Sequence, residues 1–163
     1  MKKLLLLLLL YCLPCAPQAW AADAPDREAV IARVQAFFDA MTERDLDAMR
    51  DLLTDDGILY GYRETPDGLR LARIPHRDYI DGLGSGRARL VERFWQPQVL
   101  LHDRMAVVWT PYDLYVDGAF SHCGIDSFSF LKTEAGWKIA GIVFSMETDG
   151  CEPGPLGPLE ERP

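Results

Sequence analysis

Three side chains in the C-terminal half of the sequence have types and spacing suited to proton transfer: Asp113, His122 and Asp126. Asp117-Gly118, between two segments of alternating apolar residues, predicts a two-residue hairpin turn. That register places Asp113 opposite His122, with their Cβ atoms about 5 Å apart. A carboxylate at this distance can orient an imidazole and leave its other nitrogen as a base. The alternative is a partly solvated cross-strand pair that only mildly stabilises the hairpin.

Asp126 is the second chemical feature, because it interrupts an otherwise apolar strand. The same register places it opposite Trp109, and a three-residue loop at 134–136 places it opposite Phe144. A carboxylate in such surroundings has to be protonated, hydrogen-bonded or paired, and a raised pKa suits a general acid. The alternative is a structural carboxylate, bonded to Tyr112, Trp109 or a backbone amide, or left near an open rim.

Apolar and aromatic residues share the predicted sheet face with these groups. Trp109, Phe128 and Phe144 are expected to form the apolar wall of a ligand pocket. Arg93, as an anion clamp, and Tyr79 are the candidates to complete it. The sequence leaves open which face of its strand Arg93 occupies, since a slip of one residue exchanges the two faces.

Several other chemistries lack the motifs that they require. The sequence has no HExxH, no CxxC, no glycine-rich phosphate loop after a strand and no GxSxG. Its three histidines are spread along the chain, which disfavours a metal site. We therefore expect neither a metal nor a cofactor.

The N-terminus has the order of an export signal. Lys2-Lys3 precede the apolar run Leu4–Leu10, and Ala19-Trp20-Ala21 offers small residues to a signal peptidase. The apolar run is well short of the roughly 20 residues that span a bilayer. We expect residues 1–21 to be cleaved after Ala21, which leaves a secreted or periplasmic protein without a membrane segment.

Charge and cysteines narrow the functional classes further. Loss of the signal removes two lysines and changes the net charge from −8 to −10, so nucleic acid is a poor candidate partner. It also removes two of the four cysteines. Cys123 and Cys151 remain, and an oxidising compartment favours a disulfide between them. A reactive thiol is the weaker alternative, because neither residue lies in a CxxC pair.

The order of the predicted elements indicates an α+β fold. Helical spacing of apolar residues is followed by long alternating strands, which places the helices on one face of a curved antiparallel sheet. The expected helices are 26–41, 46–53 and 76–83, and the expected strands are 58–62, 69–74, 90–101, 105–116, 119–131 and 137–146. Residues 22–150 form the domain, and the Pro/Gly-rich tail 151–163 is expected to be disordered.

Within this pattern the sequence resembles the nuclear transport factor 2-like (NTF2-like) superfamily, and most closely the exported bacterial SnoaL-like or lumazine-binding-like domains. The resemblance covers about residues 26–150. It is carried by Ala106–Trp109, Tyr112–Tyr115, Asp117-Gly118, Ser121–Gly124, Asp126 and Gly136–Ile139. It implies a cone-shaped sheet wrapped around N-terminal helices, with an apolar cavity inside and often a homodimer.

The leading functional hypothesis is that the cone binds a small apolar or aromatic molecule. The first alternative is a cofactor-independent isomerase, dehydratase or hydrolase-like enzyme that uses Asp113, His122 and Asp126. The second alternative is a non-catalytic, dimeric interaction module. Fold alone does not choose between them.

Overall fold

The computed structural model describes residues 24–152 and 154–159, so the expected signal peptide lies outside the described residues. The helices are α2 (Ala24–Glu43), α3 (Leu46–Leu52) and α4 (His76–Ser85). The strands are β1 (Leu53–Thr65), β2 (Gly68–Pro75), β3 (Leu90–Phe94), β4 (Gln98–His102), β5 (Met105–Val116), β6 (Ala119–Thr133) and β7 (Gly136–Ser145). In the described part of the chain, no helix combines the length and apolar character needed to cross a membrane.

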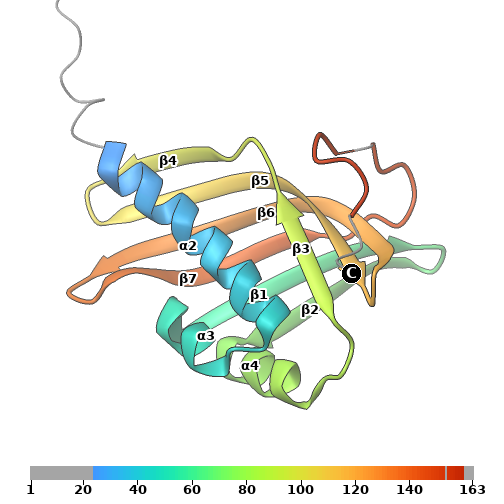
Figure 1. Cartoon of the computed structure of the whole chain (residues 1–163), viewed down its shortest axis with the longest axis horizontal. Coiled ribbons are helices and arrows are strands. Elements are labelled where there is room, and N and C mark those ends of the chain that lie inside the picture. The colour runs from blue at the N-terminus through green and yellow to red at the C-terminus, as the bar shows by residue number, and fades with distance from the viewer. Residues whose placement is uncertain (1–23, 153, 160–163) are drawn as a thin grey trace, which may run out of the picture.

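The strands form one curved sheet in the order β2-β1-β7-β6-β5-β3, and β4 pairs with the other end of β5. Neighbouring strands are antiparallel except β1 and β7, which run parallel. The long helix α2 lies diagonally across one face of the sheet, and α3 and α4 close one end (Figure 1). The predicted α+β class is confirmed, with one parallel pair that the sequence did not indicate.

The apolar stripe of α2 explains why this helix lies on the sheet. Val30, Val34, Phe37, Phe38 and Met41 follow helical spacing and are buried. Polar contacts fix the start of the helix: the Lys132 ammonium lies 2.6 Å from Asp26 Oδ1, and Trp137 Nε1 donates to the same oxygen at 3.0 Å. The helix is thereby held over the centre of the sheet.

The β5–β6 hairpin contains the predicted turn but not the predicted register. Asp117 and Gly118 have positive φ angles of 51° and 83°, and Val116 pairs with Ala119 as expected. A bulge at Ser121 then shifts the pairing by one residue. His122 therefore lies opposite Leu114, and the expected pairs Asp113–His122 and Trp109–Asp126 are wrong.

The β6–β7 hairpin shows two deviations that cancel. Its loop has two residues rather than three, so Thr133 pairs with Gly136. A bulge at Ala140 restores the expected register further along the strand. Asp126 therefore pairs with Phe144 as predicted, and the pairing of Phe128 with Ile142 is also confirmed.

The expected strand 90–101 is divided into β3 and β4. The chain turns between them at Gln96, whose φ of 49° lies in the left-handed region. Both strands pair with β5, at opposite ends. This division decides which side chains of β3 face the interior.

A disulfide joins Cys123 to Cys151, with a Cα–Cα distance of 6.0 Å, which confirms the predicted pairing. The described residues beyond it contain no helix or strand. They nevertheless contact the sheet, because Arg93 Nη2 donates to the carbonyl of Gly157 at 2.9 Å. The described part of the tail thus lies against the face of the sheet opposite α2.

Candidate functional site

A cavity of about 310 Å³ lies between α2 and the inner face of the sheet. Most of its wall is apolar, and the polar exceptions are few. The lining residues are Phe37, Phe38, Met41, Leu59, Ala72, Ile74, Tyr79, Leu90, Glu92, Tyr112, Leu114, His122, Asp126, Phe128, Ile142, Phe144 and Met146. An apolar pocket with a few convergent polar groups is the usual form of a small-molecule site.

Two carboxyl groups face each other in this cavity, Glu92 from β3 and Asp126 from β6. Each carboxyl group shifts the pKa of the other, which places them within reach of a shared proton. Burial raises the pKa of Asp126 to about 7. Burial and the neighbouring carboxyl of Asp126 raise the pKa of Glu92 well above its usual range. At neutral pH the pair therefore retains a proton inside an apolar wall.

Asp126 is the more enclosed member of the carboxyl pair, at 3% exposure. Its Oδ2 atom has no hydrogen-bond partner among the described residues. Buried polar atoms of this kind are rare in folded proteins and call for an explanation. Because Asp126 lines the cavity, a bound molecule is one such explanation.

Tyr112 supports the wall beside the carboxyl pair. Its hydroxyl donates to the carbonyl of Ser145 at 2.7 Å, and its ring is 1% exposed. Gly124, opposite Tyr112 in β6, permits this approach, because a methyl group there would lie 2.2 Å from the Ser145 carbonyl oxygen. Burial, followed by the charges of Glu92 and Asp126, raises the pKa of Tyr112. The hydroxyl is thus a neutral, occupied donor.

His122 lines the cavity four residues from Asp126 on the same strand, about 13 Å away along it. Its Nδ1 lies 3.0 Å from the hydroxyl of Ser121, and its ring meets the Tyr112 ring edge-on at 5.8 Å. Burial, followed by the nearby Arg63 charge, lowers the pKa of His122. The imidazole is therefore neutral at pH 7.

Asp113, the expected partner of His122, faces the other side of the sheet. There it forms a bidentate ion pair with Arg93: Nε lies 2.9 Å from Oδ1 and Nη2 lies 2.5 Å from Oδ2. Arg93 also lies 5.0 Å from the centre of the Tyr115 ring. Neither residue of the pair lines the cavity, so Arg93 does not clamp a ligand there and Asp113 does not orient His122.

The other sequence-predicted ligand contacts divide between the two faces. Phe128, Phe144 and Tyr79 line the cavity as expected. Tyr79 stacks on Phe37, with the ring centres 5.7 Å apart and the planes 15° from parallel. Trp109 lies on the outer face at 49% exposure, because the bulge at Ser121 reverses its strand relative to the prediction.

Glu92 is the charged cavity residue that the sequence did not predict. Leu90, Glu92 and Phe94 alternate along β3 on the inner side, whereas Arg93 points outward. Arg93 lies directly opposite Asp113 in β5. Opposite charges at directly paired positions favour this register. The Arg93–Asp113 pair is therefore the sequence signal that could have placed Arg93 outside and its neighbour Glu92 inside.

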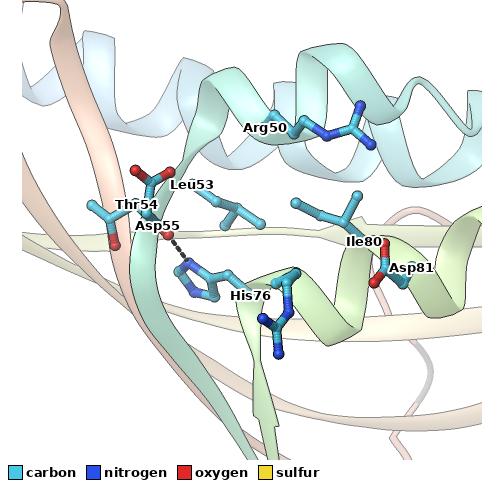
Figure 2. Close-up of a pocket in the computed structure, with 8 residues that line it drawn as sticks. Arg50, Leu53, Thr54, Asp55, His76, Ile80 and Asp81 are labelled. Atoms are coloured by element: carbon cyan, nitrogen blue, oxygen red, sulfur yellow. Dashed lines mark hydrogen bonds between the residues drawn. The ribbon is translucent and has the colours of Figure 1, made fainter.

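His76 belongs to a second, smaller pocket of about 290 Å³ between α3, the start of β1 and α4 (Figure 2). Its side chain is buried against Gly57, and its Nδ1 donates to the carbonyl of Thr54 at 2.7 Å. The His76 side chain makes no hydrogen bond that caps α4. This pocket shares no lining residue with the cavity. Among the described residues, no group of three or more potential metal ligands gathers in either place.

The family model of the SnoaL-like domain matches residues 30–149. The chain belongs to the SnoaL-like domain family. This family lies within the NTF2-like superfamily, so the sequence resemblance is confirmed. A search of curated proteins finds no significant match.

Solved structures agree with this SnoaL-like fold. An NTF2-like protein from Cytophaga hutchinsonii superposes with a TM-score of 0.63 at 14% identity, over 74% of this chain and 97% of that one. An NTF2-like protein with a cystatin-like fold from Novosphingobium aromaticivorans gives 0.61 at 18% identity, over 85% and 94%. An NTF2-like superfamily protein from Salmonella enterica gives 0.60 at 12% identity, over 80% and 98%. Similarity at these identities establishes the fold and leaves the activity to the site.

Proposed function

We propose that this SnoaL-like domain binds a small, mostly apolar molecule in the cavity between α2 and the sheet. The observation that carries the proposal is the presence of two carboxyl groups, Glu92 and Asp126, in the otherwise apolar wall of one cavity of about 310 Å³. Burying Asp126 beside the half-buried Glu92 without a compensating cation is costly. A ligand that uses these groups would account for their retention in the interior.

The polar groups of the cavity lie at two positions along its wall. Glu92 and Asp126 offer a proton and acceptor oxygens to the polar end of a ligand. His122, about 13 Å further along β6, is a second polar contact for a long molecule. The aromatic side chains between them supply the apolar contact area that dominates affinity.

The entrance variant Ala72→Trp tests this proposal. Ala72 lines the cavity and is exposed, so a large side chain there is expected to obstruct the cavity without disturbing the core. Arg73→Trp, one residue further along β2, is the matched control, because successive side chains of a strand point to opposite faces. With naphthylmethanol as the probe, titration calorimetry should show binding to the parent and to Arg73→Trp, and at least tenfold weaker binding to Ala72→Trp. Equal affinities for both variants would contradict the proposed location.

A second candidate function, acid–base catalysis on the bound molecule, is favoured by the pKa of Asp126 near 7. In such a reaction, the carboxylate removes a proton from a carbon next to a carbonyl group and the resulting acid returns it. Glu92 replaces Asp113 as the partner group of this hypothesis.

β-Tetralone in D2O provides a direct assay for this candidate reaction. The wild-type protein should accelerate the exchange of its α-hydrogens for deuterium, as followed by NMR. Asp126→Asn should abolish the acceleration, whereas Asp113→Asn should preserve it. Exchange at the uncatalysed rate with the wild-type protein would exclude this chemistry for carbonyl ligands of this size.

Export and self-association remain predictions with direct tests. Sequencing of the mature N-terminus checks cleavage after Ala21. For the homodimer, the outer face of the sheet places Trp109, Val143 and Tyr60 in one exposed row. Sedimentation equilibrium distinguishes a single chain from a pair.

A further inference from the structure

The charge of the cavity is unbalanced. Glu92 and Asp126 line it, and neither lysine nor arginine is among its described lining residues. The one basic group there is His122, whose pKa is lowered by burial, so it carries no charge at pH 7. On the outer face of the same sheet, by contrast, the Asp113 carboxylate has the Arg93 guanidinium. The interior therefore favours a positive guest over a negative one.

The hydrogen-bonding groups of the cavity are unbalanced in the same direction. Asp126 Oδ2 is buried and has no donor among the described residues. The hydroxyl of Tyr112 already donates to the Ser145 carbonyl. A proton retained by the Glu92–Asp126 pair can serve only one of their acceptor oxygens at a time. The cavity thus offers more acceptors than donors, and a ligand with N–H groups would complete it.

Aromatic rings provide the third feature. The lining contains the faces or edges of Phe37, Phe38, Tyr79, Tyr112, Phe128 and Phe144. An aromatic ring attracts a cation to its negative face, and the attraction grows when both partners are removed from water. Aromatic walls with carboxylates at one end are suited to an ammonium group carried on a hydrophobic body.

We propose that the cavity selects a hydrophobic amine in its protonated form, with the ammonium group at the Glu92–Asp126 pair and the apolar body among the aromatic side chains. This inference rests on the proposed function, that the cavity takes a small apolar molecule, and adds the class of that molecule. The negative net charge of the chain, −8 in the full sequence, assists by attracting cations.

Binding of such an amine changes the protonation of the site. An ammonium group satisfies both carboxylates, so the shared proton leaves to solvent as the ligand enters. The titratable groups around the pair are Tyr79 from α4, Tyr112 from β5 and His122 from β6. Asp113 also influences Glu92 from the outer face. The other lining side chains, from α2, β1, β2 and β7, carry no ionisable group.

Calorimetric titration with two probes of similar shape tests the inference. Naphthylmethylamine and naphthylmethanol differ in the ammonium and hydroxyl groups. At pH 7 the amine is expected to bind at least tenfold more tightly than the alcohol. In buffers of different ionisation enthalpy, its binding should release up to about one proton, and binding of the alcohol should release none.

The variants separate this inference from the proposed function. The double variant Glu92→Gln with Asp126→Asn keeps the shape of the pair, so it should lose the preference for the amine and still bind the alcohol. Asp113→Asn, a carboxylate removed from the outer face, should keep the preference. Binding of the alcohol as tightly as the amine to the wild-type protein overturns the inference alone. Failure of both probes to bind overturns the proposed function as well.

Discussion

The two faces of the sheet differ in whether a buried carboxylate has a cationic partner. Glu92 and Arg93 are neighbours in β3 and point to opposite faces. On the outer face, Arg93 holds Asp113 in a bidentate ion pair, with Asp113 5% exposed. On the inner face, Glu92 meets Asp126 with no cation, and one oxygen of Asp126 stays unpartnered.

The difference separates a structural role from a ligand-binding role. A carboxylate whose acceptors are filled by a guanidinium has little left to offer a ligand, and its removal leaves the cation unpaired. A carboxyl pair that retains a proton weakens the folded state at neutral pH, and its free oxygen is available to a guest. The outer pair therefore belongs to the fold, and the inner pair to the candidate site.

The largest expected effect concerns the outer face, where the disulfide ties the tail to the sheet. Replacing both cysteines, Cys123→Ser with Cys151→Ser, should lower the free energy of unfolding by about 3 kcal/mol, because the unfolded chain regains the freedom of a closed loop. Urea unfolding at pH 7 measures this change. Affinity for naphthylmethanol should stay within twofold of the parent. A parallel loss of binding would show that the two faces are not independent.

The next effect follows from removing one partner of the outer ion pair. Asp113→Asn leaves the Arg93 guanidinium with a neutral partner and should lower the free energy of unfolding by about 2 kcal/mol. Asp126→Asn is the matched control on the inner face and should be neutral or stabilising at pH 7. Equal destabilisation by the two variants would contradict the division between the faces.

A third effect is expected in the pH dependence of stability. The pKa of Asp126 rises from 3.8 to about 7 on folding, so the folded chain holds a proton that the unfolded chain releases in this window. The contribution of Asp126 to stability is therefore full below about pH 4 and is lost as the pH rises through 7. Asp126→Asn removes this loss, so the variant should become progressively more stable relative to wild type as the pH rises from 4 to 8. A difference that stays flat across these pH values would argue against a protonated pair.

The fold could be predicted from the strand pattern because turns and strands are specified by residues that are close together in the sequence. The Asp117-Gly118 turn needs two positive φ angles, which glycine and aspartate tolerate, and alternating apolar residues specify a half-buried strand. The pairing of Asp126 with Phe144 was predicted, although a shorter loop and the bulge at Ala140 produced it together. The predicted and observed pairings agree there only because the two deviations compensate for each other.

The candidate site was predicted only in part because its geometry depends on bulges. Serine at position 121 does not by its type predict a β-bulge. The bulge nevertheless shifts the pairing by one residue and so places Asp113 and Trp109 on the outer face. Glu92 was not predicted for a related reason. The chain turns at Gln96 and so divides into two strands a run of residues that has the pattern of one strand. The apolar lining at Phe128 and Phe144 was predictable, since it follows from alternation alone.

The smallest expected effect concerns Trp109, which the sequence placed in the apolar wall and the structure places outside, at 49% exposure. Trp109→Ala should change the free energy of unfolding by no more than about 0.5 kcal/mol, because exposed side chains contribute little to folding. Phe144→Leu is the matched change inside the cavity and should weaken the binding of naphthylmethanol severalfold, since it removes part of the wall. Calorimetric titration of both variants under the same conditions measures the contrast. Weaker binding by Trp109→Ala at unchanged stability would mean that the ligand also contacts the outer face. The assignment of ligand binding to the inner face alone would then be wrong.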